Sequence, residues 1–534
     1  MTDFHKKSIQ SLLSEKRLAE AFAELRQTAQ TLQNWQLNNR LDELEESYKY
    51  MIRYVADGCN DPQREEIHNG ITAKLMELAD ITEQELTVQN SPKLYYETLR
   101  MERKYPRSLE ALLEAYRECA DKTALFYELP ADKRDSDQER TLLMEKEKAA
   151  NAVFKHIWVT FPVTANEAGT LDKLFADADA TAEIKELAMA ATMLSLLEHY
   201  SEHLLLSLLD LYAANAFNDA SLSMKALCCA LIAMHCHRET IQHSNAISLR
   251  IANIADSERG RRDIMTVFLQ FIRSRSTERI SQKVRDELVP KLMKLSPEMR
   301  RKMRDGFSDD IEEMAKNPDW QEMLNESGIT DKMQELSRMQ AEGSDVFLSS
   351  FARLKSFPFF NDVANWFVPF TPRHSSIFRV FAGNSGSMLL SMVDRTGAFC
   401  DSDKFSFALS VATMPDQHRS MMMAQFDEQQ EQVINEMAGS LPNPDKQREN
   451  IANKYVQSLY RFFNLFRSRN DFYNPFSTRL NLIDVPFVSD ALSDTKSLRL
   501  IAEFYFSMQC YTDALSTFGK VLKQDSPTAS DYQK

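Results

Sequence analysis

The chain has 534 residues, too many for one compact hydrophobic core, so we expect several domains or one extended array of repeats. Only 12 residues are glycine, whereas average usage is about 7%. Because tight β-turns and phosphate-binding loops depend on glycine, this composition argues against turn-rich β-proteins and nucleotide-binding folds. The net charge of −14 argues against general binding to nucleic acids or membranes.

The sequence carries no sign of targeting or of an oxidising compartment. Lys6 and Lys7 are not followed by an apolar stretch, so we expect no signal peptide. No run of about 18 apolar residues predicts a transmembrane helix. The seven cysteines are scattered without a CxxC pair, which favours reduced thiols over disulfides. We therefore expect a cytoplasmic protein without membrane association.

Residues 1–165 are predicted to form an N-terminal helical region. Apolar residues recur mostly at steps of three and four across Leu37–Val55, which indicates one face of an amphipathic helix. A second helical run covers Leu94–Tyr127. The polar stretch Pro130–Gln138 is expected to be a loop before the next helix.

Residues 166–304 contain an internal similarity. The segments Glu183–Leu197 and Ser221–Met234 are both rich in alanine and long apolar residues, and a shift of 38 residues brings Ala188 onto Ala226. A helix pair that recurs at this interval is close to the HEAT-type period, so we expect HEAT-like helical repeats. The alternative is a coincidental similarity between two buried helices. In either case this region is expected to be the most buried part of the chain.

A basic stretch is followed by an acidic one. Residues 259–304 carry 14 Lys/Arg and 5 Asp/Glu, and Arg275, Arg279 and Lys283 form a stripe at steps of four. Residues 305–346, with 12 Asp/Glu against 3 Lys/Arg, are expected to be an acidic connection between two halves. We favour internal pairing between the stripe and this connection, or a solvated face. The alternative is a nucleic-acid-binding groove that uses the three basic residues.

Residues 347–383 concentrate aromatic side chains. Phenylalanines cluster around Trp366, and three prolines interrupt regular helix: Pro358, Pro369 and Pro372. We expect an irregular wedge whose rings fill the joint between two helical layers. The alternatives are an exposed aromatic binding patch or an enzyme site near Trp366. A further helical region is expected over residues 384–494.

The clearest repeat signature lies at residues 495–528. Ala502 and Ala514 occupy the small repeat positions 8 and 20, and Tyr505 and Phe518 occupy the aromatic positions 11 and 24. This pattern resembles the tetratricopeptide repeat, in which two helices approach closely where the small residues lie. One helix pair cannot bury both of its faces, so we expect this repeat, which opens the region 495–534, to be truncated.

The resemblance implies a function. Tetratricopeptide-repeat proteins bind peptides or protein segments on the concave face formed by the first helix of each pair, which here would present Arg499, Glu503 and Phe506. Members that hold chaperone tails have lysine and asparagine where this chain has Arg499 and Glu503, so we do not expect that role. Two further segments resemble uncharacterised bacterial tetratricopeptide-repeat proteins: Leu354–Phe370 and Cys400–Phe407.

Signatures of metal binding and catalysis are weak. His199 and His203 are four residues apart but lack the HExxH order, and we interpret them as surface or capping residues. Cys228, Cys229 and Cys236 lie among small apolar residues, which favours close helix packing over metal binding. No phosphate-binding loop or nucleophile motif is present. We expect no metal, no cofactor and no enzyme activity.

Together these features predict an all-α protein, an α-solenoid of stacked helical hairpins with a HEAT-like middle and a tetratricopeptide-like end. The predicted function is that of a non-catalytic scaffold, which binds another protein or a peptide on a concave helical face. Neither the identity of that partner nor the oligomeric state is indicated by the sequence.

Overall fold

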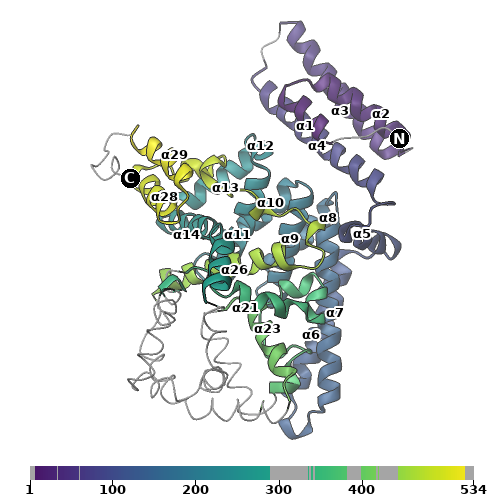
Figure 1. Ribbon diagram of the computed structural model, residues 1–534. Coiled ribbons are helices and arrows are strands. Elements are labelled where there is room, and N and C mark those ends of the chain that lie inside the picture. Colours follow the sequence, from purple (N-terminus) through teal and green to yellow (C-terminus); the bar gives the residue numbers. More distant parts are fainter. Residues whose placement is uncertain are drawn as a thin grey trace.

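In the computed structural model, all regular secondary structure of the described residues is helical (Figure 1). The described residues are 6–32, 34–58, 61–288, 335, 338–340, 343–381, 399–415, 419 and 443–523. The prediction of an all-α protein is therefore confirmed. None of the helices in these ranges has the length and apolar character needed to cross a membrane.

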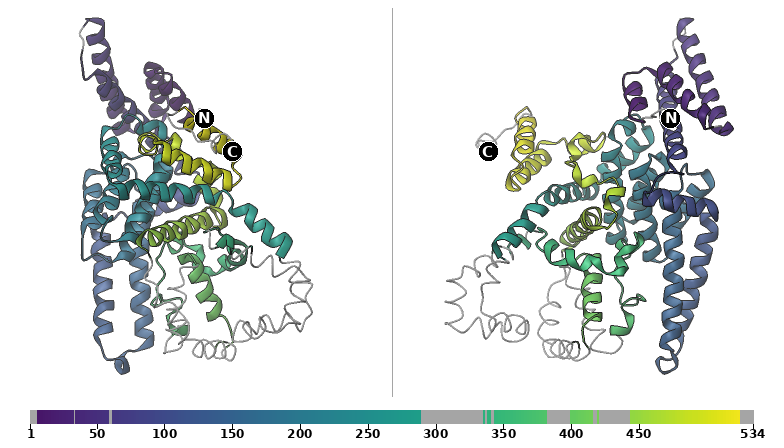
Figure 2. Two further views of the ribbon diagram at one scale, coloured as in Figure 1. Left: turned by 90° about the vertical axis from the view of Figure 1, so that its left-hand side faces the viewer. Right: turned by 45° about the vertical axis from the view of Figure 1, so that its right-hand side comes forward.

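The first four helices form a group with its own core at one end of the molecule (Figures 1 and 2). Leu37 and Leu41 of α3 are buried in this core, as predicted, but Ile52 and Val55 are exposed. The tip of the α3–α4 hairpin projects beyond the other two helices (Figure 1), so the far half of the apolar face remains uncovered. The group comprises α1 (Lys6–Ser14), α2 (Leu18–Thr31), α3 (Trp35–Ala56) and α4 (Arg64–Thr87).

The next helices include the long pair α6–α7, which runs along one side of the molecule (Figure 2). The predicted helical run Leu94–Tyr127 is divided, because Pro106 disfavours helical conformation at Tyr105. The loop predicted before α7 contains a short 3₁₀ turn, and the Asp135 carboxylate caps α7 by accepting the Gln138 N–H. The elements are α5 (Leu94–Lys104), α6 (Leu109–Glu128), η1 (Ala131–Lys133), α7 (Ser136–Val159) and α8 (Ala165–Ala176).

The predicted similarity at 38 residues corresponds to two helices of equal length. A shift of 38 carries both ends of α9 (Ala182–Glu198) onto both ends of α11 (Ala220–Cys236). The two helices pack against each other and are buried on nearly all sides, as expected for this region. The neighbouring elements are α10 (Glu202–Asn215), α12 (Arg238–Ile241), α13 (Asn245–Asp256), α14 (Glu258–Ser274), α15 (Thr277–Lys283) and the π-helical turn η2 (Val284–Leu288).

The aromatic segment is a wedge of short turns, as predicted. The Phe367 ring stacks on Phe154 of α7 at 5.8 Å, and the Phe359 ring stacks on Phe405 of α23 at 4.6 Å. Because most of these rings are buried, the alternative of an exposed aromatic patch is wrong. The elements are α21 (Leu348–Ala352), η3 (Arg353–Ser356), η4 (Pro358–Asn361), η5 (Ala364–Trp366), η6 (Phe378–Phe381) and α23 (Asp401–Ala412).

Helix α26 (Pro444–Leu465) lies in the middle of the molecule (Figure 1). It packs against α11, α14 and α23, so a helix from late in the chain is inserted among helices from its middle. The predicted acidic connection 305–346 lies almost entirely outside the described residues. The remaining elements are η7 (Arg469–Asp471), η8 (Pro475–Ser477), η9 (Leu482–Asp484), α27 (Val488–Ala491), α28 (Thr495–Ser507) and α29 (Tyr511–Val521).

Charged side chains buried at one end of α26 hold several segments together. Arg461 forms ion pairs with Asp345 at 2.8 Å and with Asp403 of α23 at 2.7 Å. Lys355 of η3 pairs with the other oxygen of Asp403 at 3.0 Å and donates to the Ser406 hydroxyl. These two cations and two anions are each at most 3% exposed. The set is neutral overall, which limits the cost of removing its charges from water.

A second buried ion pair lies at the other end of α26. The Arg448 guanidinium binds both carboxylate oxygens of Asp263 on α14 and donates to the Ala216 carbonyl and the Ser223 hydroxyl. The Tyr212 hydroxyl donates to the same carboxylate at 2.8 Å. Helices α10, α11, α14 and α26 therefore meet at one polar cluster inside an otherwise apolar core.

We predict that Asp403→Ala lowers the free energy of unfolding by about 3–5 kcal/mol, because it leaves buried positive charge without its counter-ion. Asp445 provides the matched control, since it pairs with Arg262 at 2.8 Å in a solvent-exposed position. Asp445→Ala should cost less than about 1 kcal/mol. Chemical denaturation monitored by circular dichroism would compare the two variants, and equal losses would contradict the assigned role of the buried cluster.

His156 joins α7 to two other helices. Its Nδ1 lies 3.3 Å from the Glu102 carboxylate of α5, and its Nε2 lies 3.0 Å from the Glu167 carboxylate of α8. Burial by itself would lower the pKa of His156, but the two carboxylates outweigh burial and raise the pKa to about 9. The imidazolium therefore stabilises this junction at neutral pH.

We predict that His156→Gln costs about 2–3 kcal/mol of stability near pH 6 and much less above pH 9. In the unfolded chain a histidine has a pKa near 6.5. The raised pKa thus stabilises the fold fully below about pH 6.5, and this contribution disappears as the pH rises through about 9. Denaturation curves of both proteins across this range provide the test. A difference in stability that does not change with pH would contradict the prediction.

Candidate functional site

The C-terminal helices α28 and α29 form a pair with defined ends. The Asp494 carboxylate caps α28 by accepting the Ser497 N–H at 3.0 Å. After α28, Gln509 has a φ of 62°, and the Cys510 N–H donates to the Tyr505 carbonyl. The left-handed backbone conformation of Gln509 reverses the chain direction within a short turn. As a result, α29 packs directly against α28.

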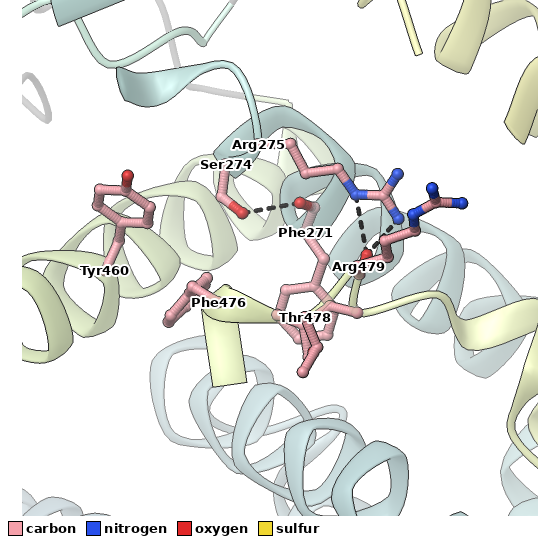
Figure 3. Close-up of a pocket in the computed structure, with 8 residues that line it drawn as sticks. Phe271, Ser274, Arg275, Tyr460, Phe476, Thr478 and Arg479 are labelled. Atoms are coloured by element: carbon pink, nitrogen blue, oxygen red, sulfur yellow. Dashed lines mark hydrogen bonds between the residues drawn. The ribbon is translucent and has the colours of Figure 1, made fainter. Parts of the chain in front are cut away.

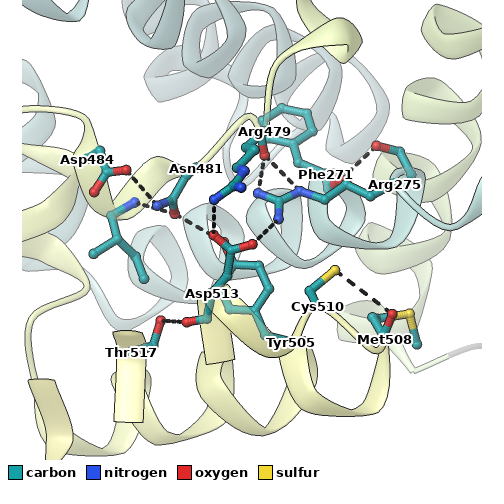
Figure 4. Close-up of polar contacts among 12 residues, drawn as sticks. Phe271, Arg275, Arg479, Asn481, Asp484, Tyr505, Met508, Cys510, Asp513 and Thr517 are labelled. Carbon is teal, nitrogen blue, oxygen red and sulfur yellow. Dashed lines mark hydrogen bonds and ion pairs between the residues drawn. The ribbon is translucent and has the colours of Figure 1, made fainter. Parts of the chain in front are cut away.

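Arg275, directly after α14, makes a central contact between that helix and the pair (Figure 4). The Arg275 guanidinium donates to the Arg479 carbonyl and forms an ion pair with Asp513 of α29 at 3.0 Å. It also lies over the Tyr505 ring at 5.2 Å, and the Tyr505 hydroxyl donates to the Asn481 side chain. The side chains of Arg275 and Asp513 are 17% and 15% exposed, so this contact is shielded from solvent.

A small cavity lies beside this contact (Figure 3). It has a volume of about 80 Å³, and its walls include Phe271 of α14, Tyr460 of α26 and Phe476 of η8. Binding sites for organic ligands usually span several hundred Å³. The cavity therefore has room for water-sized molecules only and is not a candidate ligand site.

The structure places all three residues of the predicted basic stripe in contacts within the protein. Arg275 binds the C-terminal pair as described, and Arg279 donates to the Gln509 side chain. Lys283 pairs with Glu335 of the acidic connection at 2.5 Å. The favoured pairing with that connection is thus seen for Lys283, whereas the two arginines contact the C-terminal pair instead. Residues 289–304 of the basic stretch lie outside the described residues.

The residues predicted to bind protein do not share one environment. Phe506 is exposed and contacts the Tyr511 ring at 5.6 Å. Arg499 and Glu503 are half-buried and take part in interactions within the protein. Of these three predicted residues, Phe506 therefore offers the most accessible apolar surface.

An exposed apolar stripe on the second helix was not predicted. Tyr511 and Leu515 are 58% and 75% exposed, and Leu522, directly after α29, is also exposed. Their spacing of four and seven residues places them on one helix face. Apolar residues with the same spacing also occur on buried helix faces. The sequence pattern alone therefore does not show that these three residues are exposed. Together with Leu500 and Phe506, these residues make the C-terminal pair rich in exposed apolar side chains.

Trp366, suggested as the centre of an enzyme site, is part of the core. Its side chain is buried, and its indole N–H donates to the Phe360 carbonyl at 2.9 Å. Phe462 and Phe466 of α26 contact the indole edge-on. Trp366 does not line the small cavity beside Arg275.

The candidate metal ligands have separate environments. His199 is buried and stacks on the Phe161 ring at 4.4 Å, whereas His203 is exposed and pairs with Asp172 at 2.9 Å. Burial raises the pKa of Cys228 and Cys229, so both thiols stay protonated. Within the described ranges, no three histidine, cysteine or carboxylate side chains are grouped to hold a metal ion.

Comparison with known proteins finds no matching family model, no matching curated protein and no matching solved structure.

We predict a coupling energy of about 1–2 kcal/mol between Arg275 and Asp513 in a double-mutant cycle of Arg275→Ala and Asp513→Ala. The shielded geometry and the additional carbonyl acceptor make this pair stronger than an ordinary surface pair. Arg285 and Glu278 form a suitable comparison, because their side chains are 54% and 55% exposed. Their coupling should stay below about 0.5 kcal/mol. A coupling near zero for Arg275 and Asp513 would contradict the proposed docking contact.

Proposed function

We propose that this protein is a non-catalytic scaffold that binds a helical segment of another protein on its C-terminal helix pair. The observation that carries the proposal is the exposed apolar stripe along α29 and its C-terminal end, formed by Tyr511, Leu515 and Leu522. Exposed apolar side chains that stand singly are common, whereas several on one helix face are typical of an interaction surface.

The shape of the stripe suits a helix. Tyr511, Leu515 and Leu522 stand at positions i, i+4 and i+11, and Gly519 occupies position i+8 between them. A Cβ atom added at Gly519 would meet nothing within 4 Å, so this position opens outward. A partner backbone can approach closely there because glycine has no side chain. Amphipathic helices bind to such surfaces through residues at steps of three and four.

The charges beside the stripe favour an acidic flank on the partner. Lys520 and Lys523 are exposed next to the apolar residues, and their side chains can pair with carboxylates at the edge of a bound helix. At the other side, Phe506 contacts Tyr511 and extends the apolar surface toward α28. We therefore propose an amphipathic helix with acidic residues along one edge as the ligand class.

The tetratricopeptide-like pattern supports a role in protein binding, but such repeats bind on the first helix of the pair, whereas the stripe lies on the second. Ala502, Ala514, Tyr505 and Phe518 are buried, as the resemblance requires of the small and aromatic positions. We propose that the pair is a tetratricopeptide-type unit, with Phe506 contributing from the face that such repeats use for binding. The free cysteines of the described residues, including the adjacent Cys228 and Cys229, support the proposal of a reducing, cytoplasmic location.

The decisive variant is Leu515→Asp, which places a charge at the centre of the stripe. Because Leu515 is 75% exposed, the fold should lose less than about 0.5 kcal/mol of stability. Binding of a partner should weaken about tenfold or more, since central apolar residues dominate interface energies. Leu125→Asp, at a leucine of α6 that is 62% exposed, is the matched control and should leave binding unchanged.

The measurement has two stages. Affinity purification from cells that produce the protein would identify chains retained by the wild type and by the Leu125→Asp variant but lost with Leu515→Asp. Each candidate would then be purified and titrated by calorimetry against all three proteins. If no purified chain distinguishes Leu515→Asp from Leu125→Asp, the proposed function is refuted. Loss of self-association instead would identify a second copy as the occupant and would refute the binding of a different protein.

A further inference from the structure

An open groove of about 450 Å³ lies between α13 and α27 and reaches Asp494, the residue that caps α28. Its volume falls within the range of about 300–1,000 Å³ that is usual for ligand sites. The stripe residues Tyr511, Leu515 and Leu522 do not line it. This groove is therefore separate from the proposed helix-binding surface.

Part of the lining of the groove is apolar. Ala252 and Ala255 of α13 face Ala491 of α27 across it, and the Phe487 ring contributes the largest apolar group. These residues are half-buried or exposed, so the surface is accessible to an extended chain. Small side chains on both walls leave space for a long, unbranched side chain of a ligand.

Phe487 is held in the groove by a tight turn. Its φ and ψ are 66° and −38°, and the Val488 N–H donates to the Pro486 carbonyl at 2.8 Å. A hydrogen bond between residues two apart defines a γ-turn, which is rare and strained for a residue that has a side chain. The surrounding packing therefore fixes Phe487 in a conformation that a free chain seldom adopts, and its ring remains at the groove.

The groove is electronegative. Asp256, Asp490 and Asp494 line it together with one cation, Arg261. The Arg261 guanidinium donates to the carbonyl groups of Ala255 and Asp256 at the C-terminal end of α13. It therefore neutralises the negative end of that helix dipole. The three carboxylates leave an excess of negative charge in a groove whose lining also includes apolar side chains.

We propose that this groove binds a basic peptide segment of a partner protein. The aliphatic stem of an arginine or lysine lies along Phe487 and the three alanines, and its cation lies at Asp256 and Asp490. Long basic side chains combine an apolar stem with a charged end, which matches the two surfaces of the groove. A neutral segment would gain nothing from these carboxylates, and an acidic segment would be repelled by them.

The test uses a fluorescein-labelled hexapeptide with two arginines between alanines, and the same peptide with citrulline in place of arginine. Citrulline preserves the shape of the side chain but removes its charge. In anisotropy titrations of the full chain, the arginine peptide should bind with a Kd below about 1 mM and several-fold tighter than the citrulline peptide. Its affinity should also fall with added salt.

Two variants locate the binding site. Asp256→Asn combined with Asp490→Asn should weaken binding about tenfold, at about threefold for each charge. Phe487→Gly permits the same backbone conformation and removes the ring, so it should also weaken binding several-fold. Two controls should bind as the wild type does: Asp121→Asn, at an exposed aspartate of α6, and Leu515→Asp, which tests the other surface. Leu515→Asp changes the proposed helix-binding surface but not the groove. Its result therefore shows whether the two proposals fail independently of each other.

Several results would overturn the proposal. One is equal affinity for the arginine and citrulline peptides. Another is an affinity unchanged by Asp256→Asn with Asp490→Asn, which would indicate general attraction to an acidic protein. Absence of binding by the arginine peptide up to about 1 mM would also refute it.

Discussion

Two guanidinium groups of α26, removed from water at opposite ends of the helix, fix the arrangement of the described structure. Arg448 binds Asp263 of α14, 185 residues earlier in the chain, and Arg461 binds Asp345 and Asp403. A buried charge is tolerated only beside its counter-charge. The segments that carry these carboxylates therefore cannot separate from α26 without a cost of several kcal/mol. Helix α26 therefore fixes the position of the aromatic wedge, residues 347–383, relative to the helices from the middle of the chain.

The proposed binding surface depends on the same framework. Helix α14 presents Asp263 to α26 near its first turn, and the chain directly after its last turn presents Arg275 to Asp513 of α29. The C-terminal pair is therefore attached to a helix that is itself held by a buried ion pair. A surface anchored in this way is pre-organised, so less conformational entropy is lost when a partner binds. Leu515 and Tyr511 can then act as fixed contact residues on the outside of the molecule.

Local patterns in the sequence predicted the elements better than their arrangement. Glycine scarcity and apolar periodicity predicted the helices, and the small and aromatic positions of the tetratricopeptide-like pattern predicted the C-terminal pair. The insertion of α26 was not predicted, because an arginine within a helix ordinarily marks a solvent-facing position. A signal was present: Arg448 is in register, at steps of four, with the buried residues Ala452 and Val456. The exposure of Leu515 could not be predicted, since its spacing suits a buried face equally well and only tertiary contacts decide between them.

Hydrogen exchange of the Arg448→Leu variant tests the central role of α26 most directly. This change leaves Asp263 buried without its counter-charge, and the loss should reach every helix that meets at that carboxylate. We predict faster exchange in α10, α11 and α14 as well as in α26, and also in α28 and α29, which are attached to α14. Faster exchange confined to α26, with unchanged protection in the other helices, would contradict the account.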